Sequence, residues 1–232
     1  MLKHYDDRGP SDLDGIFASD FESNWHMQGG ERAALIYLLQ RFRPKISIEI
    51  GTFLGGSLRP ISTYSDKVYT FDIDPNQHRV APQFPSVEFV TGDTADTLRP
   101  VIESIVAAGE EIGFILIDGS HETEGVRKDV EACLSYVPRR TPCVIVMHDS
   151  SNPKVRAGLL AANWGASPYV QSLDLDFVPG ALYNRADIKD QIWGGLAVAL
   201  LTPKSRQGPL NVQANFSYSL EKLRVVASPG GK

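Results

Sequence analysis

The sequence lacks the features that mark secreted, membrane-bound and disulfide-rich proteins. Only 2 of its 232 residues are cysteines, and Cys133 and Cys143 lie in apolar segments without CxxC spacing. Such cysteines are typical of buried free thiols in a reducing compartment. The longest late apolar run, GGLAVALL, is too short to cross a bilayer, and the charged start, MLKHYDDRGPSD, has no signal-peptide core. We therefore expect a cytoplasmic protein without a membrane partner.

Clustered positive charge and several catalytic motifs are also missing. The chain has 23 Lys and Arg against 28 Asp and Glu, a net charge of −5. Phosphate backbones require clustered cations, so we expect no nucleic-acid partner. There is no HExxH, no GK[ST] and no GxSxG around Ser120. These absences disfavour a metalloprotease, a P-loop nucleotide site and a serine hydrolase.

What the chain does contain is an alternation of short apolar runs and amphipathic stretches. A hydrophobic fraction of 42% suits one globular domain. Repeated strand–helix–strand units favour an α/β, doubly wound, mostly parallel sheet covered on both faces. The predicted strands are 46–50, 68–73, 87–90, 113–118 and 143–147, with two later ones in 169–177 and 194–201, and the predicted helices are 31–42, 95–108 and 124–137.

The predicted domain organisation is a core flanked by two extensions. We expect an N-terminal extension or lid over 1–26, the α/β domain over 27–203, and a C-terminal extension over 204–232. The last of these ends in Ser-Pro-Gly-Gly-Lys, a composition typical of a frayed tail.

The first predicted strand runs into a glycine-containing turn, IEIGTFLGGS. A dinucleotide site requires GxGxxG, but Phe53 takes the place of the second glycine and blocks the approach of a pyrophosphate. A ligand with an adenosine and an amino-acid tail remains compatible, with loop amides and Glu49 beside its ammonium group. A tight turn without any ligand is the alternative.

The next two predicted strands end in further acids. Asp72 is placed to accept both ribose hydroxyls, while Asp74 more simply caps the turn at Pro75. After the third strand, Asp93 or Thr94 could meet an adenine amino group. For Asp93 the alternative is a helix N-cap.

Two more predicted strands end in an acid with a histidine nearby. Asp118 precedes His121 by three residues, and His148 is followed by Asp149. The carboxyl ends of parallel strands are where α/β sheets bind ligands, so these side chains should meet at one edge. Two carboxylates at close range favour a cation between them.

In order, IEIGTFLGGS, VYTFDIDP, VTGDTADTL, FILIDGSH and VIVMHDSS resemble the successive motifs of class I S-adenosylmethionine-dependent methyltransferases. The resemblance is closest to the macrocin and mycinamicin sugar O-methyltransferases and cephalosporin-hydroxylase-like proteins, and covers roughly residues 27–165. It implies a Rossmann-like, seven-stranded sheet whose last strands are antiparallel.

The resemblance also implies roles for particular residues. The methionine part of S-adenosylmethionine would contact Glu49, Gly51, Phe53 and Ser57, the ribose Asp72, and the adenine Asp93 with Thr94. A divalent metal would be held by Asp118, His148 and Asp149, with Asp118 and His121 as the catalytic residues and His121 as general base.

One position departs from the family pattern. The relatives usually have an acid where this chain has His148, and imidazole suits Zn, Fe, Ni or Cu better than Mg²⁺. The metal could therefore be a softer ion, or the site could hold no metal. His148 could also be an outer-shell residue, a second base or a loop hydrogen-bonding group. His121 has its own alternative, as a cap for a helix that begins near Glu122.

The expected function is S-adenosylmethionine-dependent O-methylation of a small hydroxylated molecule, a sugar or a secondary metabolite. One alternative is a non-catalytic binding or regulatory protein with this fold; another is a nicotinamide-dependent oxidoreductase, which Phe53 disfavours. The chain could also form a homo-oligomer. Aromatic-bearing loops offer candidates for acceptor recognition: Trp25, His26, Trp164 and Trp193.

Overall fold

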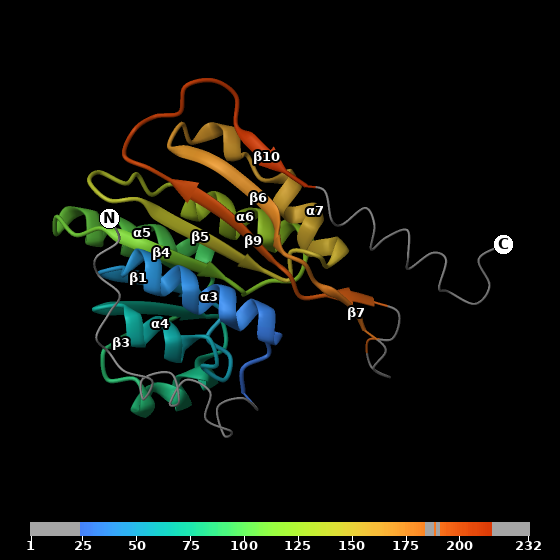
Figure 1. Cartoon of the computed structure of the whole chain (residues 1–232). Coiled ribbons are helices and arrows are strands. Elements are labelled where there is room, and N and C mark those ends of the chain that lie inside the picture. The colour runs from blue at the N-terminus through green and yellow to red at the C-terminus, as the bar shows by residue number, and fades with distance from the viewer. Residues whose placement is uncertain (1–23, 184–187, 189–190, 215–232) are drawn as a thin grey trace, which may run out of the picture.

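The computed structural model of the chain describes residues 24–183, 188 and 191–214, and it is an α/β structure built on one large sheet (Figure 1). The helical elements are α3 (Gly29–Phe42), α4 (Leu58–Tyr64), η1 (Pro75–Gln83), α5 (Thr94–Ala107), α6 (Thr123–Cys133), α7 (Pro153–Ala161) and η2 (Trp164–Ala166). The strands are β1 (Ile46–Ile50), β2 (Lys67–Asp72), β3 (Val87–Thr91), β4 (Ile112–Ile117), β5 (Cys143–His148), β6 (Val170–Val178), β7 (Ala181–Tyr183), β8 (Gln191–Trp193), β9 (Leu196–Leu201) and β10 (Asn211–Gln213).

The large sheet has the order β10-β6-β9-β5-β4-β1-β2-β3. β1 to β5 pair in parallel, whereas β9 runs antiparallel to both β5 and β6. The doubly wound, mostly parallel sheet and its late antiparallel pair are thus confirmed. The strand number differs from the prediction of seven, because the three-residue β10 adds an eighth strand beside β6. β7 and β8 form a separate hairpin that projects beyond the ends of the sheet strands (Figure 1).

Two apolar clusters cover the two faces of the sheet. Apolar residues of β4 alternate between them: Ile115 and Ile117 pack with α5, α6 and α7, whereas Phe114 and Leu116 pack with α3 and α4. Figure 1 shows α3 and α4 in front of the sheet and α6 behind it. All six residues of β4 and of β5 are buried. Strands buried on both faces appear in sequence as continuous apolar runs, which is why these two were predicted correctly.

The chain reverses its direction of winding between β1 and β4. From β1 it proceeds outward to β2 and β3, and then returns to β4 on the other side. Gly51 follows β1 with φ of 96°, and a Cβ on it would lie 2.2 Å from the Asp118 carbonyl oxygen. Only glycine allows this close backbone contact with a positive φ. The loops after β1 and β4 are therefore packed together at the switch point, where such sheets bind ligands.

The extensions lie partly outside the described residues. Residues 1–23 of the predicted lid, and the Ser-Pro-Gly-Gly-Lys tail, belong to that part. The remaining Asn24–His26 segment lies on the glycine turn, since a Cβ on Gly56 would come within 2.5 Å of the Trp25 Cα. Among the described residues no helix has the length and apolar character needed to span a bilayer.

Gly158 offers a test of how closely α7 packs on α6. A Cβ at this position would lie 2.6 Å from the Thr123 carbonyl oxygen and 2.7 Å from the Val126 Cβ. We expect Gly158→Ala to lower the free energy of unfolding by about 1–3 kcal/mol in urea denaturation, because the two helices must move apart. Gly30→Ala is the matched control, since its Cβ would meet only Val178 at 3.9 Å. Equal stability of both variants would contradict the packing.

Candidate active site

A cavity of about 820 Å³ opens at the carboxyl edge of the sheet. Its size is typical of small-molecule sites. It is continuous from the glycine turn after β1 to the acid and histidine residues after β4 and β5. Of the predicted site residues, those that line it are Gly51, Phe53, Ser57, Asp72, Asp93, Thr94, Asp118, His121, His148 and Asp149. The structure thus brings ten of the predicted residues to one cavity.

Asp72, the last residue of β2, determines the shape of the glycine turn. Its Oδ2 accepts hydrogen bonds from the backbone N–H groups of Thr52 and Phe53, each at 3.1 Å. Phe53 adopts a φ of 45°, which is uncommon for a residue other than glycine. Its side chain is 48% exposed and lies edge-on to His26 at 5.2 Å between ring centroids. The aromatic ring therefore remains available at the mouth of the cavity.

Glu49 lies below the cavity rather than in its wall. Its carboxylate is fully buried and accepts hydrogen bonds from the hydroxyls of Ser57 at 2.6 Å and Thr70 at 2.7 Å. Burial raises the pKa of Glu49 to about 8, against the opposing effect of these two hydrogen bonds. The predicted contact of Glu49 with a cofactor ammonium group stays a prediction. Of Glu49 and its hydrogen-bond partner Ser57, it is Ser57 that lines the cavity.

Asp93 and Thr94 begin α5 at the cavity wall. Asp93 is the N-cap of the helix, and its side chain accepts from the Ala95 N–H at 2.9 Å. Its predicted alternative role is therefore present, although the residue also lines the cavity. The Thr94 hydroxyl donates to Asp129 on α6 at 2.5 Å. Burial raises the pKa of Asp129, a cavity residue that the sequence analysis missed.

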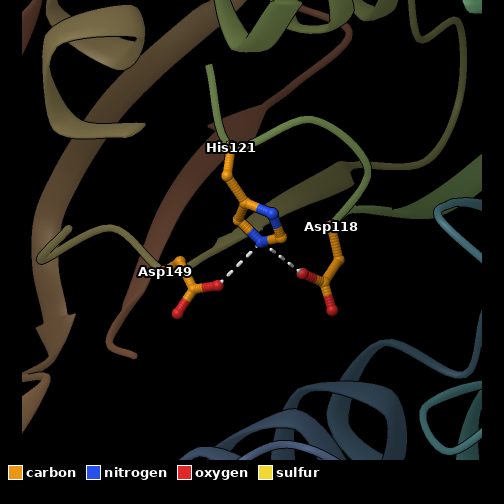
Figure 2. Close-up of side chains that lie close together, drawn as sticks. All are labelled: Asp118, His121 and Asp149. Carbon is orange, nitrogen blue, oxygen red and sulfur yellow. Dashed lines mark ion pairs between the residues drawn. The ribbon is translucent and has the colours of Figure 1, made fainter. Parts of the chain in front are cut away.

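Asp118, His121 and Asp149 converge at the other end of the cavity (Figure 2). The His121 ring points between the two acids, with its Nε2 2.9 Å from Asp149 Oδ2 and 4.0 Å from Asp118 Oδ1. One potential ligand atom from each residue lies within 4.8 Å of the others. His121 is not a helix cap, because Glu122 takes the N-cap position and its backbone N–H donates to the Ser120 hydroxyl at 3.2 Å.

His148 ends β5 and contacts the same two acids from the buried side. Its Nδ1 lies 2.9 Å from Asp118 Oδ1 and 3.4 Å from Asp149 Oδ2. Its Nε2 lies 3.5 Å from Oε2 of Glu31, a buried acid on α3. Glu31 was missed by the sequence analysis, since its only local signal is that of a helix-capping residue three positions after Gln28.

The electrostatics of this cluster are those of two acids compensated by two imidazoles. The hydrogen bond to Asp149 is the main cause of a raised pKa for His121. Burial alone would lower the pKa of His148, but the charges of Asp118 and Asp149 outweigh it and hold that pKa well above its usual range. Burial would likewise raise the pKa of Asp149, but the positive charge of His148 and the hydrogen bond from His121 lower it.

Aromatic side chains form the outer wall of this part of the cavity. Trp193 on β8 lies edge-on to His121, at 5.4 Å between ring centroids. Tyr183, on the paired strand β7, accepts a hydrogen bond from the Gln28 side chain at 2.9 Å. Trp25, His26 and Trp193 line the cavity as predicted candidates for acceptor contact. Trp164 does not, because it is buried in the core and donates to the Leu159 carbonyl.

The buried Glu49 makes folding stability depend on pH. Because its pKa is raised from 4.5 to about 8 in the folded protein, stability falls as pH rises through this interval. We expect the free energy of unfolding of the wild type to fall by about 2–3 kcal/mol between pH 6 and 9. Glu49→Gln should not show this fall, because its amide does not titrate. Urea denaturation of both proteins at the two pH values measures the difference. Parallel pH dependence in the two proteins would contradict a buried, titrating Glu49.

The comparisons with known proteins agree with this geometry. Residues 48–150 match a family described as a methyltransferase domain. A search of curated protein sequences finds no match. The matched segment contains four of the five motifs quoted above and all but the last residue of the fifth, so the resemblance seen in the sequence is confirmed.

Solved structures with the same architecture share little sequence with this chain. The O-methyltransferase from Bacillus cereus in complex with SAH is 18% identical, with coverage of 84% of this chain and 92% of that one and a TM-score of 0.53. TomG from Streptomyces achromogenes, an O-methyltransferase in complex with SAM, is 14% identical, covering 87% and 92%, with a TM-score of 0.52. MycE from the mycinamycin pathway, with Mg, SAH and mycinamycin VI, is 17% identical, covering 83% and 54%, with a TM-score of 0.53. The chain therefore has the fold of these methyltransferases, and its residues 48–150 match a methyltransferase-domain family.

Proposed function

We propose that this protein is an S-adenosylmethionine-dependent O-methyltransferase that acts on a hydroxyl group of a small molecule. The observation that carries the proposal is the single cavity, which joins a donor region at Asp72 and Asp93 to the cluster at Asp118. An enzyme that transfers a methyl group needs both regions in one enclosed space. The neighbours crystallised with SAM or SAH, and MycE with mycinamycin VI, support this assignment.

The donor region suits a nucleoside with an amino-acid tail. Asp72 at the end of β2 supplies carboxylate oxygens for ribose hydroxyls, as acids in this position do in other doubly wound folds. Asp93 and Thr94, which line the cavity, would contact the adenine, and Gly51 and Ser57 would contact the methionine tail. When bound, S-adenosylmethionine supplies an electrophilic methyl group on its sulfonium. The exposed Phe53 stands where a pyrophosphate would need glycine, so a nicotinamide cofactor is disfavoured.

The cluster at the other end fits a divalent metal ion. Asp118, His121 and Asp149 place one donor atom each within 4.8 Å of the others, and His148 Nδ1 faces the same two acids. Carboxylate and imidazole donors together are a common ligand set for divalent ions. When bound, such an ion supplies a Lewis acid and a template at the acceptor hydroxyl. The residues that would hold it are Asp118 and Asp149, with an imidazole as the further ligand.

His121 is the proposed general base. In the structure its Nε2 faces Asp149 at 2.9 Å, so this nitrogen must be free of its proton before it can accept one from the acceptor hydroxyl. Its raised pKa means that the neutral ring becomes abundant only above the usual histidine range. His121 would hold the proton of the acceptor hydroxyl while that oxygen takes the methyl group and the sulfur leaves with the electron pair of the carbon–sulfur bond. In-line positioning of the two reactants supplies much of the rate enhancement.

Other features of the protein follow as parts of the proposal. Two buried free thiols, Cys133 and Cys143, support a cytoplasmic location. Aromatic residues around the cluster, Trp193 and Tyr183, suit an acceptor with a ring. The non-catalytic alternative is disfavoured by the convergence of the acids and His121 in an open cavity. Homo-oligomerisation and the boundaries at 26 and 203 stay predictions.

Ligand binding is tested by thermal unfolding. At 100 times its dissociation constant, a ligand stabilises the folded protein by roughly 2.7 kcal/mol. For a chain of this size we expect S-adenosylmethionine and S-adenosylhomocysteine to raise the unfolding midpoint by about 5–10 °C. NAD is the control and should give no shift, and each ligand is measured with Mg²⁺ and with a chelator. A shift with NAD alone would overturn the assignment of the cofactor.

The catalytic residues are tested by substitution. We expect Asp118→Asn and His121→Ala each to lower methyl transfer by at least about 100-fold, the usual contribution of a general base or a charged ligand. Radioactive methyl transfer to a panel of phenols and sugars measures activity. Calorimetric binding of S-adenosylhomocysteine should change little, since neither residue belongs to the donor region. Full activity in either variant would show that its role is assigned wrongly.

A further inference from the structure

Glu31 is a buried carboxylate without a role in the function proposed above. It lies in the first turn of α3 and is 1% exposed. Its Oε2 accepts from the Gln28 N–H at 2.5 Å, and its Oε1 accepts from the Gly195 N–H in the turn between β8 and β9. Two segments far apart in sequence therefore hold this carboxylate in one position. Burying an acid is costly unless charged partners and hydrogen bonds compensate it, so its location requires an explanation.

Glu31 lies directly behind His148. The distance from its Oε2 to His148 Nε2 is 3.5 Å, while the opposite ring nitrogen, Nδ1, faces Asp118 and Asp149. Within the described part of the chain, the buried Nε2 has no hydrogen-bond partner, and the Glu31 carboxylate is the charged group that it faces. The ring thus bridges the pair of acids and a third carboxylate. Metal-binding histidines in proteins usually have this environment, with one nitrogen toward the ion and the other N–H directed at a carboxylate.

The donor separations are those of ligands around one ion. Two atoms that each lie about 2.1 Å from an ion are roughly 3.0–3.4 Å apart in octahedral or tetrahedral geometry. His148 Nδ1 lies 2.9 Å from Asp118 Oδ1 and 3.4 Å from Asp149 Oδ2. In the structure, Nδ1–H donates the hydrogen bond to Asp118. A divalent ion between the acids would displace this proton, and Nδ1 would then be placed as a third ligand while Nε2 keeps its own proton.

We propose that Glu31 is a positioning residue that directs Nε2–H of His148 toward itself and so presents Nδ1 as a metal ligand. As a consequence the cluster prefers borderline ions such as Zn²⁺ or Co²⁺ over Mg²⁺, because imidazole is a poor ligand for Mg²⁺. The inference rests on the proposed function, of which it specifies the metal class and the residue that selects it. The hydrogen bond that Glu31 accepts from the Gln28 N–H does not involve His148. If Glu31 only capped the helix, its substitution would therefore change metal affinity equally with and without His148.

A double-mutant cycle on metal affinity separates the two roles. Co²⁺ binding is followed by its visible absorption and Mg²⁺ binding by calorimetry, in the wild type, Glu31→Gln, His148→Asp and the double variant. We expect Glu31→Gln to weaken Co²⁺ binding about 10–100-fold when His148 is present, the usual effect of losing such a carboxylate. In the His148→Asp background the same change should alter the affinity less than about threefold. His148→Asp alone should lower the preference for Co²⁺ over Mg²⁺ at least about tenfold.

Glu111→Gln is the matched control. Glu111 is a buried acid that precedes β4, at the end of the strand opposite to Asp118, and it bonds Arg140 and Thr141. Its substitution should leave both metal affinities unchanged. An equal loss of Co²⁺ affinity from Glu31→Gln in both backgrounds would overturn the positioning role. If His148→Asp leaves the preference for Co²⁺ over Mg²⁺ unchanged, the proposed metal class is wrong.

A second measurement does not depend on any variant folding. In the wild type loaded with Zn²⁺, the ¹⁵N chemical shifts of His148 should show a protonated Nε2 and a metal-bound Nδ1. A protonated Nδ1 would overturn the proposal. Binding of S-adenosylhomocysteine is measured on the same samples: its absence would contradict the proposed function, whereas the metal readouts decide the role of Glu31 independently.

Discussion

The approach of Asp118 and Asp149 at the carboxyl edge of the sheet is the constraint on which the rest of the site depends. β4 and β5 are neighbouring parallel strands, so the acids that follow them must lie close together. Like charges at this range repel unless cations or donors compensate them. His121 and His148 supply the positive charge, and the Gly194 N–H donates to Asp149 at 2.6 Å. The loop after β4, the end of β5 and the turn before β9 are thus all oriented by two carboxylates.

The same constraint links the donor region to the acid cluster. Gly51 begins the turn that faces the proposed methyl donor, and its backbone packs on the Asp118 carbonyl so closely that a Cβ would lie 2.2 Å away. A change in one loop therefore displaces the other. In the proposed reaction the acceptor oxygen must approach the methyl carbon in line, and this packing would hold the two reactants in that alignment. The glycine serves packing between two loops as well as access for a ligand.

The turn between β8 and β9 connects the acceptor wall with the acids. Gly194 and Gly195 have φ values of 75° and 88°, and their N–H groups donate to Asp149 and Glu31. A Cβ on Gly194 would lie 2.6 Å from Glu31 Oε1, so this conformation and this contact both require glycine. Trp193 directly precedes the turn and touches the His121 ring. The proposed acceptor wall and the proposed base are consequently parts of one structural unit.

The sequence by itself determined the sheet and the positions of its terminal acids. Buried parallel strands are continuous apolar runs, so β4 and β5 were evident, and Asp118 and Asp149 follow them directly. The three residues of β10 were too short for such a signal, and Glu31 carried only that of a helix cap. Only the tertiary structure decided that Glu49 lies below the cavity, that Trp164 belongs to the core, and that Glu31 stands behind His148. These are contacts between segments distant in sequence, and local residue patterns do not encode which of them meet.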